Sequence, residues 1–416
     1  MRFTATAIVL LGCAAAVLAK EKVPSGEARQ HKHGHHHHKR RWHNIQGADL
    51  DAGATGTCQY QCDMCKPGVS ATIVGIDGQN SGPLQDTDGM CKSTPNNAQG
   101  SNSRPACGTP AIEPDLEIDG AGHLVARSHH HSRRQRLRHK NIIAGGAARP
   151  NSFPFLVAIQ FPDGRGGWMT ACGGTLITNT HVVTAAHCFG CGYDGKYRVV
   201  AGEHDEATED PIAQASCIKK ITIHPNYNDP SLPINENDIA VIEVATPFKY
   251  NDFVSPICLP NTLDDWQWVK GNDKGDNGDE HEGLAIMGWG DTKAGSNQGS
   301  KLMQEAVVKV LDQDDCREEM GNGRIGDRMM CARGEGTDTC QGDSGGPLVA
   351  YRRGKWTLAG IVSWGRGCGA KHQNKSVPGV YAHVPSFRDF LSSTIPCPEC
   401  FPGRRHHHKR KHHHHG

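Results

Sequence analysis

The chain has 416 residues, and its 45 Lys and Arg against 44 Asp and Glu give a formal net charge of +1. This balance argues against a dedicated nucleic-acid-binding protein, which usually carries a clear basic excess. Because only 36% of the residues are hydrophobic, beside 50 glycines, 26 histidines and 17 cysteines, we expect part of the chain to be linker or tail rather than core.

The N-terminus has the pattern of a secretory signal peptide over residues 1–19. Arg2 precedes an apolar run from Ala5 to Leu18, and Ala19 ends a small-residue cleavage site. No later stretch approaches the roughly 18 apolar residues that span a bilayer, so we predict a secreted, extracellular protein with no membrane span. A lipoprotein site at Cys13 is the alternative, although the apolar run continues past it. Loss of Cys13 leaves 16 cysteines, an even number that favours disulfides.

Three segments with little core of their own follow the signal. Residues 20–57 contain a histidine tract and few apolar side chains, so we predict disorder. Residues 58–107 form a small module whose four cysteines are Cys58, Cys62, Cys65 and Cys91. These allow three disulfide pairings, and the Cys62–Cys65 spacing also resembles half a zinc site. Residues 108–141 form a linker that ends in a His-rich and basic run, which is a natural place for proteolytic processing of a secreted precursor.

From Ile142 short apolar and β-branched runs alternate with Gly, Asn, Asp and Pro. These runs cover residues 155–161, 174–183, 197–203, 218–224, 238–244, 284–290, 305–311, 347–351, 357–363 and 379–384. Such spacing predicts an all-β barrel or sandwich. Pro385 opens one helix that places Phe387, Phe390 and Leu391 on one face. We place this domain at residues 142–395, and a Cys- and His-rich tail at 396–416.

The sharpest chemical signal is Gly342–Pro347, which reads Gly-Asp-Ser-Gly-Gly-Pro. Its glycines leave space around Ser344 and let backbone N–H groups converge beside it, as an oxyanion site requires. The pattern G-x-S-x-G alone also fits the nucleophile elbow of α/β-hydrolases, in which the acid and the histidine follow the serine. Here His187, in Thr-Ala-Ala-His-Cys, and Asp238, in Asn-Asp-Ile-Ala, both precede Ser344. The order His, Asp, Ser excludes the elbow.

Taken together, these motifs resemble the trypsin/chymotrypsin family of serine endopeptidases over about residues 142–395. The resemblance implies two six-stranded antiparallel β-barrels with a C-terminal helix. It also implies that Ser344 is the nucleophile, that His187 is its general base, and that Asp238 fixes the imidazole tautomer. The backbone N–H groups of Gly342 and Ser344 would then form the oxyanion hole.

The same resemblance assigns the substrate pocket. Asp338 matches the residue at the base of the primary pocket, where a buried carboxylate selects Arg or Lys before the scissile bond. Gly365 and Gly379 match the pocket walls. Ser363 supports the buried Asp238, and Trp364 lines the substrate strand, to which Gly365 hydrogen-bonds. We therefore expect trypsin-like cleavage of protein substrates.

Activation of a zymogen is implied by Ile142-Ile-Ala-Gly-Gly, which resembles the new N-terminus of the family after cleavage. The freed Ile142 amine would pair with Asp343 and order the pocket. Two departures are Ala144, where Gly is usual, and Asn141 before the cleaved bond. Either a protease that tolerates Asn cuts the Asn141–Ile142 bond, or trimming follows a cut in the basic run. An activating protease and protein inhibitors are the further partners that this implies.

The resemblance also implies a set of disulfides. The core bridges are Cys172–Cys188, Cys316–Cys331 and Cys340–Cys368, and Cys107–Cys258 tethers the prosegment. The cysteines that then remain pair as Cys191–Cys217 and Cys397–Cys400, with two bonds inside residues 58–91.

No cofactor is required by this reading, but two features could hold a metal. Some trypsins bind calcium in the loop that starts here at Glu203 and continues through Glu209 and Asp210; the usual second Glu is Ala213. The histidine tracts could bind metals weakly or become cationic in mild acid, or they are only solvated tails. The competing functional class is a metal- or polyanion-binding protein that keeps the protease fold as a scaffold. The intact His187, Asp238 and Ser344 argue against it.

Overall fold

The computed structural model describes residues 100–118, 124–125, 146–163, 166–189, 197–208, 210–260, 283–296, 298–334, 337–352, 354–372 and 375–401. The expected signal peptide, the histidine tracts, the four cysteines between residues 58 and 91, and the expected activation site from Asn141 to Gly145 lie outside these residues. Among the described residues, none of the helices is long and apolar enough to cross a membrane.

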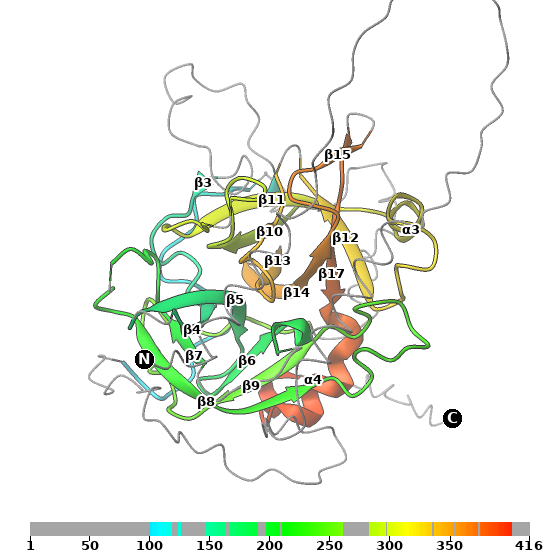
Figure 1. The fold of residues 1–416 in the computed structure, drawn as a ribbon. Helices are drawn as coiled ribbons and strands as arrows, with labels where there is room; N and C mark the ends of the chain where they lie inside the picture. The colour runs from blue at the N-terminus through cyan, green and yellow to red at the C-terminus, as the bar shows by residue number, and fades with distance from the viewer. Residues whose placement is uncertain are drawn as a thin grey trace, which may run out of the picture. The chain divides into compact units, whose positions relative to one another are not determined.

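The first half of residues 142–395 forms a closed antiparallel barrel, drawn in green in Figure 1. Around the barrel its strands follow the order β4 (Leu156–Pro162), β5 (Trp168–Leu176), β6 (His181–Thr184), β9 (Ala240–Val244), β8 (Gln214–Ile223) and β7 (Arg198–Ala201). Alternate residues such as Val157 and Ile159 on β4 and Ala240 and Ile242 on β9 fill its interior and are fully buried. The β-branched residues of these runs are suited to such a pleated, buried surface.

The second half forms a second barrel, drawn in yellow to orange in Figure 1. Its strands are β10 (Gly283–Gly288), β13 (Pro347–Arg352), β14 (Lys355–Gly365), β17 (Gly379–His383), β12 (Met329–Arg333) and β11 (Gln304–Val310). Pairing of β11 with β10 closes the ring, and Leu284, Ile286, Leu348 and Tyr381 occupy its core. The predicted all-β fold with two six-stranded barrels is therefore confirmed.

Short strands are added around the second barrel. β3 (Gly146–Ala147) pairs with β11, and β1 (Glu117–Ile118) and β2 (Leu124–Val125) extend the sheet from β10. A separate hairpin joins β15 (Lys371–His372) to β16 (Lys375–Ser376). Part of the segment 108–141, which the sequence suggested to be a linker, is thus paired with the second barrel.

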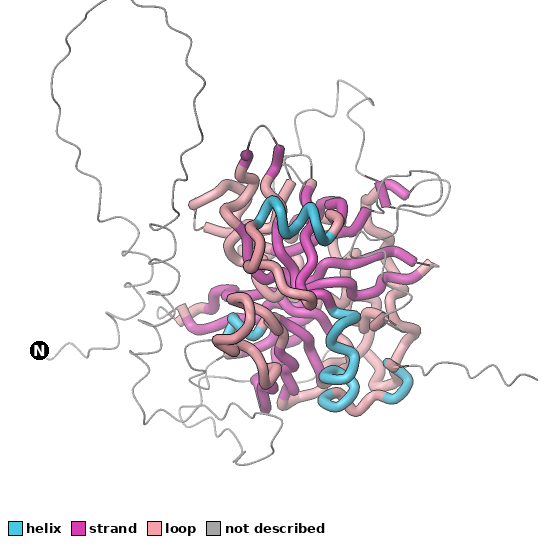
Figure 2. The backbone as a smooth tube through the Cα atoms, turned by 90° about the vertical axis from the view of Figure 1, so that its right-hand side faces the viewer, coloured by secondary structure: helices cyan, strands magenta, loops and turns pink. Residues whose placement is uncertain are grey.

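Helical segments are few among the described residues, as the cyan tubes of Figure 2 show. They are η1 (Ala186–Phe189), α3 (Gln313–Met320), η3 (Val384–Phe387), α4 (Arg388–Thr394) and η4 (Pro398–Cys400). The predicted C-terminal helix is η3 followed by α4, which bury Phe387, Phe390 and Leu391. Asp312 caps α3 by accepting a hydrogen bond from the Asp314 N–H at 2.9 Å.

The structure differs from the strand prediction at residues 174–183. This run is two strands, because β5 ends at Leu176 and a turn precedes β6. The Thr178 hydroxyl accepts hydrogen bonds from the N–H groups of Thr180 and His181 at 3.3 and 3.0 Å, and this side-chain turn replaces strand pairing. Strand β12 and helix α3 were not predicted.

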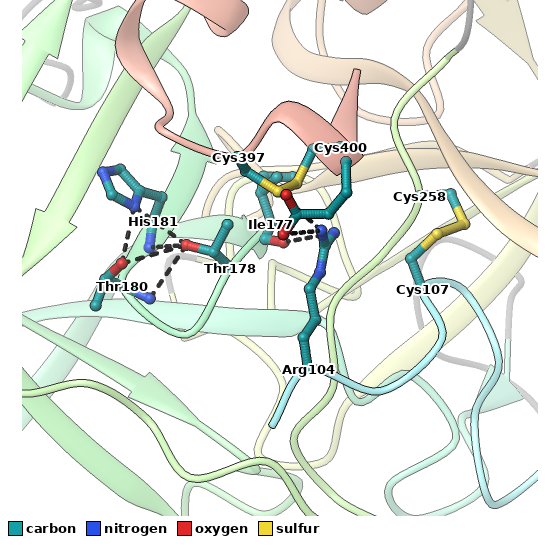
Figure 3. Close-up of a disulfide and its surroundings, with 10 residues drawn as sticks. Arg104, Cys107, Ile177, Thr178, Thr180, His181, Cys258, Cys397 and Cys400 are labelled. Atoms are coloured by element: carbon teal, nitrogen blue, oxygen red, sulfur yellow. Dashed lines mark hydrogen bonds and ion pairs between the residues drawn. A yellow bond between two sulfur atoms is a disulfide. The ribbon is translucent and has the colours of Figure 1, made fainter. Parts of the chain in front are cut away.

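Residues 100–118 lie against both barrels. Ser101 pairs with Tyr250 as an isolated β-bridge, and Cys107 forms a disulfide with Cys258. Figure 3 shows the Arg104 guanidinium directed at the carbonyl oxygen of Ile177, 3.3 Å away, and at Sγ of Cys397, 2.8 Å away. These contacts fix the segment that precedes the two barrels to the surface of the barrel domain.

Candidate active site

His187 and Asp238 are brought together by neighbouring strands of the first barrel. β6 ends at Thr184, which pairs with Ala240 at the start of β9. His187 follows β6 in η1, and Asp238 precedes β9. Asp238 Oδ2 lies 2.7 Å from His187 Nδ1, and its Oδ1 accepts the backbone N–H of His187 at 2.9 Å. The carboxylate thus holds both the ring and the backbone of the histidine.

The second barrel contributes a third contact to this carboxylate. The Ser363 hydroxyl on β14 donates to Asp238 Oδ2 at 2.5 Å, and Asp238 itself has no exposed surface. Burial opposes the charged form of His187, but the charge and the hydrogen bond of Asp238 outweigh it, so the pKa of His187 lies above its ordinary value. A ring with this pKa is suited to accept a proton near neutral pH.

Ser344 lies at the same junction of the two barrels. Its carbonyl oxygen accepts the Gly173 N–H of β5 at 2.8 Å, and the Thr184 hydroxyl, three residues before His187, donates to the Gly173 carbonyl at 2.8 Å. The next residue, Gly345, donates its N–H to the Val362 carbonyl at 2.9 Å, beside Ser363. Within the described residues, no hydrogen bond joins the Ser344 hydroxyl to the His187 ring, as is common without substrate.

The backbone around Ser344 leaves donors free. Gly342 and Gly345 have φ of 99° and 73°, in the left-handed region that favours glycine. A Cβ on Gly345 would lie 2.2 Å from the Thr184 hydroxyl oxygen. In the part of the chain that the structure describes, the N–H groups of Gly342 and Ser344 donate no hydrogen bond. Free backbone donors at these two positions are what an oxyanion hole requires.

Beside this site, Asp338 lies close to one of two glycines that face one another on paired strands. Gly365 on β14 faces Gly379 on β17, and a Cβ on Gly379 would lie 3.3 Å from Asp338 Oδ1. Asp338 is buried and accepts the Gly369 N–H at 2.9 Å. Burial raises its pKa to about 6, and no cation among the described residues counteracts this rise. The carboxylate is therefore suited to bind a cation that enters from outside.

A comparison with known protein families identifies the family of the domain that contains this site. Residues 142–391 match the trypsin family, and this match includes both barrels. The chain belongs to the trypsin family. It is thus a trypsin-like serine protease, and the family implies protein substrates.

In this trypsin domain, Asp343 is a second buried carboxylate without a cationic partner among the described residues. It accepts the N–H groups of Gly290 and Cys340 at 2.9 and 2.8 Å. Burial raises its pKa to about 6. Ile142, the group expected to pair with it, lies outside the described residues.

Disulfides frame the trypsin domain. Besides Cys107–Cys258, they join Cys172 to Cys188, Cys316 to Cys331, Cys340 to Cys368, and Cys397 to Cys400. Cys217 is also disulfide-bonded, and its expected partner Cys191 lies outside the described residues. Cys172, His187 and Cys188 lie close together, but the two sulfur atoms are already bonded to one another and cannot act as thiolate ligands.

The expected calcium loop contains a buried carboxylate. Glu203 has a buried Oε1 without a hydrogen-bond partner, and burial, with Glu206 and Asp210 nearby, raises its pKa to about 7. Glu209 lies outside the described residues. An orphaned oxygen among acidic neighbours fits a calcium ligand set in part; Ala213 supplies no second carboxylate.

Sequence reasoning missed the residues that hold the site together. Thr184 and Gly173 tie β5 and β6 to Ser344. Thr184 belongs to the motif around His187 and could have been examined there. Arg328 contacts Asn237, the neighbour of Asp238, from 91 residues away, and no local pattern indicates this contact.

Proposed function

We propose that this protein is a secreted serine endopeptidase that hydrolyses peptide bonds after Arg or Lys. The observation that carries this proposal is the buried Asp238, which contacts His187 and Ser363 at once, with Ser344 at the same junction and Asp338 beside it.

The reaction starts when the Ser344 hydroxyl attacks the scissile carbonyl carbon while His187 Nε2 takes its proton. Asp238 stabilises the imidazolium through the 2.7 Å contact to Nδ1. The N–H groups of Gly342 and Ser344 hold the oxyanion of the tetrahedral intermediate. His187 then gives the proton to the leaving amine, and an acyl-enzyme remains on Ser344. Water attacks this ester with His187 again as the base, which releases the acid product and restores the serine.

Specificity follows from the charge of Asp338. A substrate guanidinium or ammonium group that reaches this buried carboxylate supplies the cation that the described residues lack. The absence of a side chain at Gly365 leaves open space beside β14, where the substrate strand can lie and hydrogen-bond along Trp364 and Gly365.

Activation is proposed to depend on Asp343. Cleavage near Asn141–Ile142, directly or by trimming after Lys140, frees the Ile142 amine, which pairs with Asp343 and orders the adjacent Gly342 and Ser344 N–H groups. Burial of Asp343 at a pKa of about 6 supports the need for such a cation. An activating protease and protein inhibitors complete the set of proposed partners.

Secretion is supported by the N-terminal signal pattern and by the disulfides of the trypsin domain. The mechanism uses no cofactor. We propose the loop at Glu203 as the place where calcium, as a structural ion, would bind.

The proposal is tested by incubating the processed, secreted enzyme with a library of peptides and sequencing the products. We expect cuts after Arg and Lys, and Ile142 as the N-terminus of the active chain. Cuts after Phe or Leu, or full activity of a chain that still carries Asn141, would contradict the specificity or the activation step respectively.

A further inference from the structure

Asp238 follows a residue with an unusual backbone. Asn237 has φ of 63°, in the left-handed region that most L-residues avoid and that asparagine adopts more readily than they do. Asn237 is buried, with only 2% of its surface exposed. Its side-chain Nδ2 donates to the Asn226 carbonyl at 3.0 Å. The direction in which the chain enters Asp238 therefore depends on how the Asn237 side chain is held.

The second hydrogen bond of this side chain crosses to the other barrel. Arg328, which lies just before β12, donates from its guanidinium to Asn237 Oδ1 at 2.7 Å. The backbone N–H of Arg328 donates to Glu236 Oε1 at 3.1 Å. Arg328 thus binds both residues that precede Asp238.

Arg328 is itself fixed by second-barrel and C-terminal elements. Its carbonyl oxygen accepts the His383 N–H of β17 at 2.8 Å, and its guanidinium carbon lies 5.6 Å from the centre of the Phe387 ring of η3. The neighbouring ring of His224 lies 3.4 Å from the guanidinium. Burial and this guanidinium lower the pKa of His224 to about 4, so the imidazole is neutral near pH 7 and adds no positive charge beside the guanidinium.

We propose that Arg328 is a positioning residue for the proposed triad: it holds the Glu236–Asn237 segment so that the Asp238 carboxylate stays on His187. This proposal rests on the proposed function. Asp238 and His187 belong to the first barrel, whereas Ser344 belongs to the second. From the second barrel, Arg328 contacts the residue before Asp238, and Ser363 contacts the Asp238 carboxylate itself. The two contacts keep His187 and Asp238 in position relative to Ser344.

The test compares Arg328→Met with Arg328→Lys in the full-length, processed enzyme. Methionine keeps an apolar stem beside Phe387 but removes the donor, and lysine restores a donor. For Arg328→Met we expect kcat to fall on the order of tenfold with KM changed less than about twofold, since small displacements of reacting groups are costly. The pKa of His187, which Asp238 raises, should fall, and with it the acid limb of the pH profile. Arg328→Lys should recover part of the lost kcat and part of the shift in the pKa of His187.

The matched control is Arg317→Met. Arg317 forms an exposed ion pair of 2.8 Å with Asp327, the neighbour of Arg328, and its loss should leave kcat and the pH profile unchanged. If Arg328→Met does not fold, Asn237→Gly, which tolerates the φ of 63°, removes the acceptor of the same bond together with the bond to Asn226, and it should shift kcat and the His187 pKa in the same direction.

Unchanged kcat and His187 pKa in Arg328→Met, even with a lower melting temperature, would overturn the proposal; so would a loss of kcat without the shift in pKa. NMR titration of His187 needs no turnover, so it decides the role of Arg328 even if the wild-type protein cleaves no peptide, which would refute the proposed function instead.

Discussion

At the scale of single residues, three buried aspartates differ in what balances their charge. Asp238 faces His187 at 2.7 Å, whereas Asp338 and Asp343 accept only backbone N–H groups among the partners that the described residues show. Burial raises the pKa of both to about 6. A buried carboxylate of this kind favours a cation that arrives later, and the proposed function supplies one to each: the substrate side chain and the Ile142 amine.

Replacing Asp338 by Asn tests the proposed pairing of this carboxylate with the substrate side chain. The substitution keeps the shape but removes the charge that pairs with Arg or Lys. We expect kcat/KM for an Arg peptide to fall by on the order of 10²–10³, because truncating one partner of a buried charge pair is costly. Cleavage of matched peptides with Arg, Lys and Phe before the scissile bond gives the measurement. An unchanged Arg preference would show that Asp338 is only a loop residue.

At the scale of elements, the paired strands β14 and β17 border the space in which the substrate is proposed to bind. Gly365 faces Gly379 across these strands, and a Cβ on Gly365 would meet no atom within 4 Å. The fold therefore leaves room for a side chain at Gly365, and only the proposed substrate strand would require glycine there.

The variant Gly365→Val separates an effect on substrate binding from an effect on the stability of the fold. We expect the melting temperature to stay within a few degrees of wild type, since surface changes are usually small in effect, while kcat/KM for an Arg peptide drops at least about tenfold because the side chain enters the substrate path. Thermal unfolding and peptide kinetics on the same sample give both values. A variant that cleaves normally would place the substrate elsewhere.

The loop at Glu203 carries a prediction about pH. The folded pKa of about 7 exceeds the ordinary value of 4.5, so the folded protein holds more protons than the unfolded chain between these values, and stability falls as pH rises through this window. Calcium should bind the ionised carboxylate and raise the melting temperature more at pH 8 than at pH 5. Glu203→Gln should lose both effects. A calcium-induced shift that is equal at both pH values would contradict this site.

Local sequence patterns predicted the all-β class and most of the strands, whereas the two barrels and the expected roles of His187, Asp238 and Ser344 came from the resemblance to a known family. The tight turn at Ser344 needs glycines beside it, and buried strands favour β-branched residues. Both features can therefore be recognised from neighbouring residues in the sequence. The turn at Thr178, which divides 174–183, depends on one hydroxyl, and strand β12 and helix α3 lack a clear apolar period. The Arg328–Asn237 bond joins residues 91 apart, and no local pattern encodes such a pairing.

At the scale of the whole molecule, the segment before the protease domain is held at several points. Cys107 is bonded to Cys258, Arg104 contacts Ile177 and Cys397, and Leu124 pairs with Gly283 of β10. After cleavage near Ile142, the segment should therefore remain attached to the domain.

Replacing both Cys107 and Cys258 by Ser should break this attachment. In the wild type, a non-reducing gel of activated enzyme should show one band that reduction splits in two; in the double variant the two pieces should already separate without reduction. The native cleavage site and the other disulfides are unchanged, so they serve as the control. Co-migration of the pieces under denaturing, non-reducing conditions in the double variant would mean that another bond holds them.

The most direct test of the account is covalent labelling of the processed enzyme with a fluorophosphonate, followed by peptide mass spectrometry. The reagent reacts with a serine whose proton is removed by a neighbouring base and whose oxyanion is held. We predict stoichiometric label on Ser344, none in Ser344→Ala, and strongly slowed labelling in His187→Ala. No label on Ser344 in a folded, correctly processed chain would contradict the assignment of this site as catalytic.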